Sequence, residues 1–353
     1  MSTNENEPDK NKQSDLSEVR RVERVSSLHQ RAGTLAAIRR FFAENNFLEV
    51  DTPALVLAPN PECHIEPMQV EVSEKNSPGI GYLITSPEPH MKRLLGEGLQ
   101  RIYQICRCFR SDENTTFHNP EFTMLEWYRV NHDYLDVMTD CENLIRYTVG
   151  EVVGTDNLIV HGRRIDLCGQ WPRMSIAEAM NRYADVKIDF SWSAEEFSRA
   201  GKAAGCDSIH EDDPWEDTFG KLMIEKIEPA LVKEPKPLFL MDYPTFMSPL
   251  AKAKPGNPLV AERVELYIGG VELANGFTEQ NDPRLQRKNI MAERMRRVSK
   301  KYFPIDEAFL ECLHRMPDAA GMALGIDRLI MLIAAVPTIQ KTIAFLFNDE
   351  NIS

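Results

Sequence analysis

Long apolar runs and paired cysteines are both missing from this sequence. No stretch of its 353 residues approaches the roughly 18 apolar residues that a membrane span requires, and residues 1–17 lack the apolar core of a signal peptide. The seven cysteines are scattered and form no CxxC pair, so no zinc site is indicated. These absences predict a cytoplasmic protein with free thiols and no membrane partner.

An excess of positive charge is missing as well. Lys and Arg number 41 against 54 Asp and Glu, a net charge of −13, so we expect no stable nucleic-acid binding. One predicted helix runs against this background, and two interpretations of it stay open: a solvated helix face, or a docking surface for an acidic partner. Its basic residues are Arg284, Arg287, Lys288, Arg294, Arg296, Arg297, Lys300 and Lys301.

The first half of the chain combines helical and strand patterns. Residues 1–24 are polar, which predicts a disordered tail before a single domain over 25–353. The spacing of apolar residues then predicts, in order, a helix over 28–45, a strand over 47–53, two strands joined by a polar loop within 98–128, and a helix over 134–149.

The second half begins with a helical insertion, predicted over 170–235. Ser175 with Glu178 and Ser193 with Glu196 are typical of capping boxes. Asp213 followed by Pro214 is typical of a helix N-cap with proline at the first helical position.

Hairpins dominate the remaining pattern. The pair Gly269-Gly270 predicts a two-residue turn between strands over 263–268 and 271–275. A helix over 283–302 and a strand-to-helix passage over 321–336 complete the chain. Because no βαβ repeat is visible, we expect an α+β fold with a mostly antiparallel sheet flanked by helices.

The usual glycine-rich nucleotide motifs are absent. The sequence contains neither GxxxxGK followed by Ser or Thr nor GxGxxG, so any nucleotide must be held in another way. The segment from Phe109 to Tyr128 offers one. Arg110 at a strand end can clamp a phosphate, Phe122 can stack on a base, and Glu126 and Tyr128 share one face of a strand, where they can bind a cation.

Two further segments add acidic and glycine-rich features. Across the predicted hairpin Tyr267 lies opposite Glu272, so Glu265 is diagonal to Glu272, about 7–8 Å away, close enough for both to bind Mg²⁺ ions. The stretch Gly321-Met-Ala-Leu-Gly-Ile-Asp-Arg328 provides small residues that let a backbone approach ATP, followed by an arginine that can contact it.

Together these segments closely resemble the catalytic core of class II aminoacyl-tRNA synthetases, in the form that lysyl-tRNA synthetases use. His118 to Tyr128 matches motif 2 nearly letter for letter, 321–328 is similar to motif 3, and the helix and strand ending at Pro53 are similar to motif 1, which in this class forms a dimer interface. Residues 85–95 and 271–279 match further stretches. The resemblance covers about residues 25 to 350 and implies a homodimeric, ATP-dependent ligase.

The resemblance implies three groups of site residues. Those expected at ATP, with Arg110 and Arg328 as the catalytic pair, are Arg110, Asp112, Glu113, His118, Asn119, Phe122, Glu265, Glu272 and Arg328. Those expected at Mg²⁺ are Glu265 and Glu272. Those expected around the amino acid are Ser86, Glu88, Glu126, Tyr128, Asn275, Glu279 and Ala323.

The roles follow from the charges of a lysine-like substrate. By resemblance, Arg110 would hold the α-phosphate and the substrate carboxylate, and Arg328 the γ-phosphate. Glu88 would meet the α-ammonium, while Glu126 and Glu279 would surround the distal ammonium. A pocket for aspartate or asparagine would be expected to hold a cation in place of these acids. The carboxylate attacks the α-phosphorus, so no protein nucleophile is needed, and alignment and charge stabilisation suffice.

Three hypotheses about the function of the chain stay open. Only a polar tail precedes the first motif, where lysyl-tRNA synthetases carry an anticodon-binding domain. Such a chain resembles the elongation factor P–(R)-β-lysine ligases, which transfer (R)-β-lysine, or less efficiently lysine, to a lysine of that factor. Ala323 supports this, because lysyl-tRNA synthetases usually have glycine there. The alternatives are a truncated lysine–tRNA ligase and a non-catalytic regulatory paralogue.

The sequence also departs from the family pattern in three places. The loop 114–117 lacks the arginine that both families often carry before His118. Asp112 stands where the motif 2 signature has Glu, although Glu113 is adjacent. Residues 246–251 look more like those of lysyl-tRNA synthetases than like those of some elongation factor P ligases.

Overall fold

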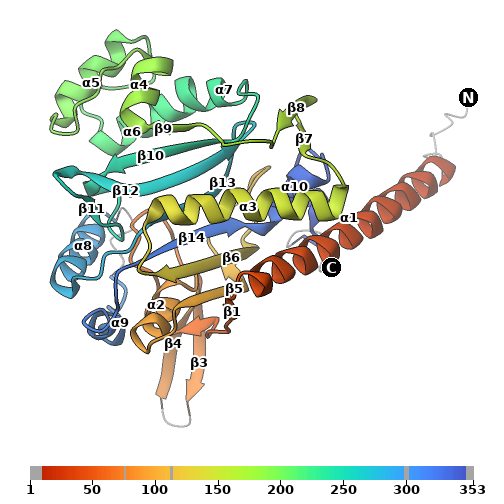
Figure 1. Cartoon of the computed structure of the whole chain (residues 1–353), viewed down its shortest axis with the longest axis horizontal. Coiled ribbons are helices and arrows are strands. Elements are labelled where there is room, and N and C mark those ends of the chain that lie inside the picture. Colours follow the sequence, from red (N-terminus) through yellow and green to blue (C-terminus); the bar gives the residue numbers. More distant parts are fainter. Residues whose placement is uncertain (1–9, 75–76, 112–113, 298–301, 347–353) are drawn as a thin grey trace, which may run out of the picture.

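The computed structural model describes residues 10–74, 77–111, 114–297 and 302–346, with side chains from residue 24 onward except at residues 74, 77 and 78. A nine-stranded sheet dominates these residues (Figure 1). Its order is β1 (Leu48–Glu49), β5 (Arg101–Phe109), β6 (Glu121–Val130), β14 (Ala319–Gly325), β13 (Val271–Thr278), β12 (Asn257–Ile268), β10 (Leu238–Pro244) and β9 (Arg173–Ser175), with β11 (Ala253–Lys254) paired to β12.

Antiparallel pairing runs through the middle of the sheet. Only the outer pairs β1–β5 and β10–β9 are parallel within the described residues. The mostly antiparallel α+β architecture expected from the hairpin signals is therefore confirmed. Smaller ladders join β2 (Leu55–Val56), β4 (Ser77–Leu83) and β3 (Gln69–Glu74), and β7 (Asn157–Val160) with β8 (Arg163–Asp166).

One face of the sheet is covered by helices. Helix α3 (Tyr134–Val153) runs across it, with α1 (Lys10–Glu44) and α10 (Ile326–Ile333) beside it (Figure 1). Alternation along β6 sends Leu125 and Trp127 into this layer, where both are fully buried against Phe42 and Ile145. The same alternation sends the even-numbered residues of β6 to the opposite face, which is partly covered by α2 (Glu88–Gly96) and α9 (Glu307–Cys312).

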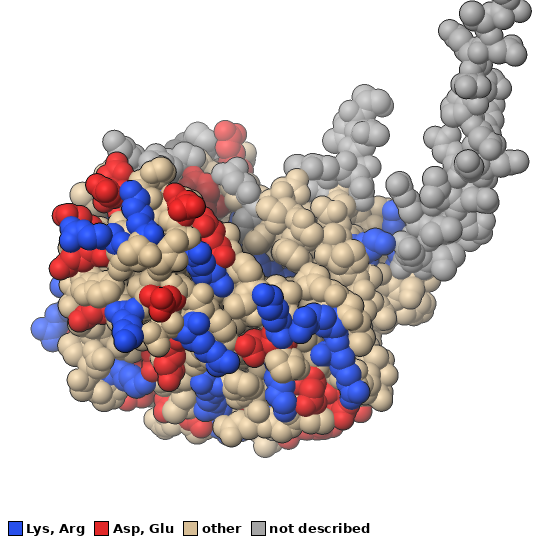
Figure 2. Space-filling model, turned by 90° about the horizontal axis from the view of Figure 1, so that it is seen from above, with Lys and Arg blue, Asp and Glu red and all other residues tan. Residues whose placement is uncertain are grey.

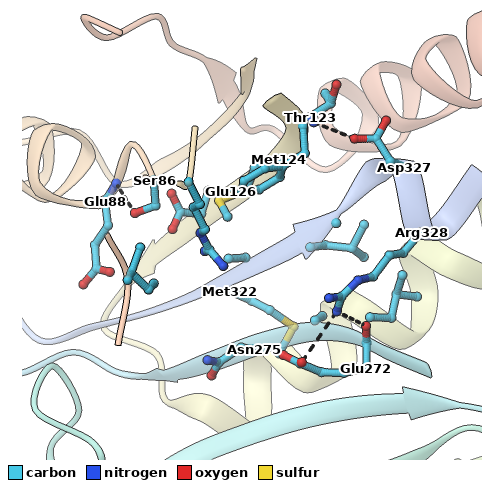
Figure 3. Close-up of a pocket in the computed structure, with 18 of the residues that line it drawn as sticks. Ser86, Glu88, Thr123, Met124, Glu126, Glu272, Asn275, Met322, Asp327 and Arg328 are labelled. Carbon is cyan, nitrogen blue, oxygen red and sulfur yellow. Dashed lines mark hydrogen bonds and ion pairs between the residues drawn. The ribbon is translucent and has the colours of Figure 1, made fainter. Parts of the chain in front are cut away.

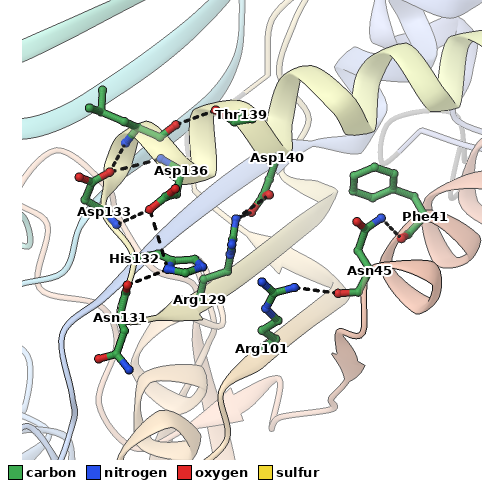
Figure 4. Close-up of polar contacts among 11 residues, drawn as sticks. Phe41, Asn45, Arg101, Arg129, Asn131, His132, Asp133, Asp136, Thr139 and Asp140 are labelled. Atoms are coloured by element: carbon green, nitrogen blue, oxygen red, sulfur yellow. Dashed lines mark hydrogen bonds and ion pairs between the residues drawn. The ribbon is translucent and has the colours of Figure 1, made fainter.

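Polar contacts fix this helical layer to the sheet (Figure 4). Asp133 caps α3 by accepting from the backbone N–H groups of Leu135 and Asp136, and the Asp136 side chain accepts from the N–H of Asp133 in return. Arg129 of β6 pairs with Asp140 of α3 at 2.9 Å. This ion pair between β6 and α3 matters for function because β6 carries several of the expected site residues on its other face.

The helical insertion forms a separate cluster above the sheet edge (Figure 1). Its helices are α4 (Ile176–Ala184), α5 (Ala194–Ala203), α6 (Trp215–Leu222) and α7 (Glu228–Leu231), which follows a π-helical turn at Met223–Ile227. Both capping boxes, at Ser175 and Ser193, are confirmed. The predicted cap at Asp213 is wrong, because Pro214 takes the N-cap position and Asp213 instead pairs with Lys221.

Two helix boundaries differ from the sequence prediction. Helix α1 begins at Lys10, so residues 10–24 are helical where a disordered tail was expected. Residues 9–32 contain no glycine or proline, and their Lys, Gln, Glu, Arg and Leu favour helix, whereas the apolar spacing marks only the part that packs. Helix α8 (Pro283–Arg296) ends before the predicted limit at residue 302.

The surface carries both signs of charge. On the face that Figure 2 shows, Lys and Arg side chains are interspersed with Asp and Glu. Within the described residues, no helix has both the length and the apolar character needed to cross a bilayer.

Candidate active site

A pocket of about 250 Å³ opens on the sheet face that α3 does not cover. Strands β6, β14 and β13 form its floor, α2 lies at one end, and the start of α10 lies at the other (Figure 3). Thirteen of the residues expected at the site line it: Ser86, Glu88, Arg110, His118, Asn119, Phe122, Glu126, Tyr128, Glu272, Asn275, Glu279, Ala323 and Arg328. Asp112 and Glu113 lie outside the described residues.

A β-bulge between β12 and β13 turns Glu272 and Asn275 of β13 toward the same pocket. Tyr267 pairs with Glu272, as the two-residue turn predicts, and Gly269 and Gly270 both have positive φ. The register then shifts by one residue, so Glu265 pairs with Asn275. Without the shift, Glu272 and Asn275 would point to opposite faces. Because of the bulge, an even-numbered and an odd-numbered residue of β13 line the same cavity.

The floor of the pocket is a row of paired residues. Glu126 of β6 pairs with Ala323 of β14, which pairs with Asn275 of β13, so the Ala323 methyl group lies between a carboxylate and an amide. On its other side Glu126 pairs with Gln104 of β5. Neither Glu126 Oε2 nor the Gln104 amide atoms have a hydrogen-bond partner within the described residues, although both side chains are buried.

Such unsatisfied buried atoms are costly, and because Glu126 lines the pocket, its unpartnered oxygen is available to a polar group of a ligand. Burial raises the pKa of Glu126 well above its usual range, and the neighbouring Glu88 and Glu279 raise it further. Burial likewise raises the pKa of Glu279 to about 8. This end of the pocket therefore concentrates carboxyl groups that an incoming cation would ionise.

The opposite end of the pocket is basic and tightly connected (Figure 3). Arg328 donates to the backbone oxygens of Glu272 at 2.6 Å and Phe117 at 3.3 Å, and to His118 Nε2 at 2.7 Å. Since arginine only donates, His118 Nε2 is the acceptor, so its Nδ1 carries the proton and donates to Thr115 Oγ1 at 2.8 Å. Arg328 thus joins the motif 2 loop, β13 and α10 at one point.

Three motif 2 residues, Arg110, Asn119 and Phe122, also line the pocket. The Arg110 guanidinium lies over the Phe122 ring, 5.0 Å from its centroid. Asn119 donates to the backbone oxygen of Glu121 at 2.6 Å, so its amide shapes the turn into β6. A positive group and an aromatic face side by side suit a phosphate and a base, and the roles predicted for these residues stay predictions.

Glu265 stands behind the pocket rather than in its lining. Its Oε2 accepts from Tyr243 at 2.6 Å and from Tyr267 at 3.0 Å, and its Oε1 accepts from Arg263 at 2.7 Å. Burial raises its pKa, Arg263 lowers it, and Glu272 raises it. The nearby Glu272 has a more exposed carboxylate, 3.5 Å from Arg328. The pair fits a divalent cation in donor chemistry, with Glu272 the accessible ligand.

Three charged groups at the site were missed from the sequence, and two of them, Lys92 and Asp327, are buried. Lys92 pairs with both Glu88 and Glu279. Asp327 accepts from the Thr123 backbone N–H at 2.7 Å and joins α10 to β6. Glu62 also lines the pocket, from the loop before β3. Lys92 lies within the matching stretch 85–95 and Asp327 within motif 3, so their positions were visible but their partners were not.

The loop that carries Glu62 is held by the basic helix. Arg297 is 4% exposed and donates to the backbone oxygens of Glu62 at 2.7 Å and Ile65 at 3.1 Å. Arg296 pairs with Glu216 and Glu293. The hypothesis that this helix is a docking surface is therefore wrong for Arg297, whose guanidinium group is buried, and stays a prediction for Arg296, which is exposed. Lys300 and Lys301 lie outside the described residues.

Comparison with known proteins agrees with this geometry. The family model described as tRNA synthetases class II (D, K and N) matches residues 8–348. The chain belongs to this class II synthetase family. The family's ligase chemistry accounts for a pocket with an acidic end and a basic end on an antiparallel sheet, and it implies the use of ATP.

Two kinds of class II relative are similar to this chain. A lysine–tRNA ligase from Moorella thermoacetica is 38% identical over 89% of the chain, which spans 64% of that ligase. An elongation factor P–(R)-β-lysine ligase from Edwardsiella ictaluri is 37% identical over 91% of the chain and 95% of the relative. A ligase of the same name from Vibrio cholerae is 37% identical over 92% of the chain and 96% of the relative.

Proposed function

We propose that this protein activates (R)-β-lysine, or lysine, with ATP and transfers it to a lysine side chain of elongation factor P. The observation that carries the amino-acid part is the cluster of Glu88, Glu126 and Glu279 at one end of a single pocket. Three acids around one buried ammonium leave two negative charges, which complement a substrate with two ammonium groups. A substrate with one ammonium would leave a buried charge uncompensated.

The relatives support the choice of acceptor, and one pocket residue supports the choice of β-lysine. The chain matches elongation factor P–(R)-β-lysine ligases over 95% of the length of the Edwardsiella ictaluri relative. Ala323 places a methyl group between Glu126 and Asn275, where a glycine would leave space. A methyl there shortens the pocket and favours an amino group shifted along the chain, as in β-lysine.

The proposed reaction has two steps. ATP supplies the AMP group: a carboxylate oxygen of the substrate bonds to the α-phosphorus as the bond to pyrophosphate breaks. The lysine amine of the acceptor then bonds to the acyl carbon, AMP leaves with the electron pair, and the amine loses a proton. In this account Arg110 orients the carboxylate and α-phosphate, while Arg328 binds the terminal phosphate after exchanging its contact with Glu272.

Three finer features belong to the same proposal. Mg²⁺ would be held by Glu272 and, through its remaining lone pair, by Glu265, which would neutralise phosphate charge. A homodimer would use the motif 1 region, where Leu48 and Leu55 are exposed apolar side chains. A cytoplasmic location agrees with seven free cysteines in the structure. Magnesium titration of the exchange rate and light scattering test the first two.

Purified protein, ATP, Mg²⁺ and either amino acid should support exchange of labelled pyrophosphate into ATP. With elongation factor P added, mass spectrometry should find the mass of one lysyl residue on one lysine. Absence of exchange would favour the non-catalytic paralogue.

A lysine–tRNA ligase remains the second candidate, favoured by the 38% identity to the Moorella thermoacetica ligase. Charged tRNA alongside unmodified elongation factor P would establish it instead.

A further inference from the structure

Lys92 is a fully buried cation at the acidic end of the pocket. Its side chain is 0% exposed, and it is not among the residues that line the cavity. The ammonium group pairs with Glu88 one turn earlier on α2, and with Glu279 after β13 at 2.5 Å. The rings of Phe277 and Phe309 lie 5.3 Å and 6.0 Å from Nζ.

Burying a lysine in this way is expensive unless its charge is well compensated. The desolvation penalty for an ammonium group in a protein interior is on the order of several kcal/mol, and a neutral side chain would avoid it. The two carboxylates that compensate Lys92 come from separate elements, a helix and the end of a strand. Both also face the cavity, so the ion pairs that satisfy Lys92 also determine where these carboxylates stand.

We propose that Lys92 is a positioning residue for recognition of a diammonium amino acid: it holds Glu88 and Glu279 at the pocket end and sets the net charge that the substrate complements. This inference rests on the proposed function, because it takes that substrate as given. Without Lys92, three carboxylates would face one another across a small buried space and would repel. With it, Glu88 at the start of α2 and Glu279 just after β13 share a fixed partner.

The other charged groups around Lys92 define the expected pH behaviour. Glu126 and Tyr128 face it from β6, Cys312 lies near it on α9, and Lys252 acts on Glu279 from the segment before β11. Burial raises the pKa of Glu279 and Lys92 lowers it. Removing Lys92 therefore raises the pKa of Glu279 further, so a higher pH is needed to ionise the pocket.

The experiment compares Lys92→Met, Lys92→Arg and wild type in amino-acid-dependent pyrophosphate exchange across pH. Lys92→Met should raise KM for lysine and β-lysine about tenfold or more, leave kcat at saturation within about threefold, and move the rising limb of kcat/KM upward by about one pH unit, a tenfold change in proton affinity. Lys92→Arg should restore more than half of the affinity.

Arg129→Met is the matched control. It removes another mostly buried ion pair, with Asp140, on the sheet face away from the pocket. It should lower thermal stability without changing KM or the pH at which kcat/KM rises. If Lys92→Met behaves like Arg129→Met, Lys92 is only structural and the inference is overturned.

If Lys92→Met does not fold, Lys92→Met/Glu88→Gln removes both charges together and is compared with Glu88→Gln alone. In the double variant kcat/KM should rise at a higher pH than in Glu88→Gln. If kcat/KM rises at the same pH in both variants, the inference is overturned.

Calorimetric binding of lysine and β-lysine separates this outcome from failure of the proposed function. Binding without exchange or transfer would refute the function and leave the role of Lys92 intact, whereas absence of binding by wild type would refute both.

Discussion

Adding one methyl group at Gly321 is predicted to weaken amino-acid recognition severely. Gly321 lies on β14 between Tyr128 of β6 and Phe277 of β13. A Cβ atom there would fall 2.5 Å from Tyr128 Cδ1 and 2.7 Å from Glu279 Oε1. Carbon atoms in normal contact are about 3.5–4.0 Å apart, so the ring must move by roughly 1 Å.

Little free space can absorb that movement, because Tyr128 is 2% exposed and Glu279 is 1% exposed. Overpacking of this kind costs about 1–3 kcal/mol of stability, and a displacement of about 1 Å in a binding group can cost about 100-fold in rate. Gly321→Ala should therefore lose about two orders of magnitude in kcat/KM for lysine in pyrophosphate exchange, with a modest fall in melting temperature.

Gly220→Ala serves as the control, since its added Cβ would meet no heavy atom within 4 Å. It should keep wild-type kinetics. A folded Gly321→Ala protein with unchanged KM and kcat would refute the assignment of Tyr128 and Glu279 to the substrate pocket.

The remaining predictions concern the charge of the pocket, its shape, and the hydrogen bonds from Arg297 to the loop that carries Glu62. Because the pKa of Glu279 is raised to about 8, kcat/KM for lysine should rise about tenfold per pH unit between pH 6 and 7 and level above pH 8, and a flat profile would contradict it. The same proton is bound more tightly in the folded protein, so stability without substrate should fall as pH rises from about 5 to 8. Glu279→Gln should reduce that slope in thermal melts, and Glu126, whose pKa is also raised, should account for part of what is left. Ala323→Gly should shift selectivity in exchange toward lysine over β-lysine, and an unchanged ratio would show that the methyl group is neutral. Arg297→Met should destabilise the protein by about 2–4 kcal/mol and raise KM, because it leaves the Glu62 and Ile65 carbonyls without their donor, whereas Arg284→Met should do neither.

The local pattern was enough to predict strands, turns and motifs, because these depend on neighbours in the sequence. The Gly269-Gly270 hairpin and the two capping boxes formed as expected. Most expected site residues also meet in one pocket, since the matching segments are long and specific.

What the sequence could not reveal depends on partners far along the chain. The bulge after Leu266 has no signal in its own residues, yet it decides which side chains of β13 face the pocket. Arg297 looked like a surface cation but is buried against a loop about 230 positions earlier. Lys92 gave no sign of burial, because Glu279 lies on a different element.

The central claim is that an activated lysine-like acyl group goes to elongation factor P. The most direct measurement is intact-mass spectrometry of elongation factor P after incubation with the protein, ATP, Mg²⁺ and (R)-β-lysine, with Arg110→Ala as the inactive control. The account predicts a shift equal to one lysyl residue, larger in yield with (R)-β-lysine than with lysine and absent for the control. An unmodified factor, in a preparation that exchanges pyrophosphate and charges tRNA, would contradict it.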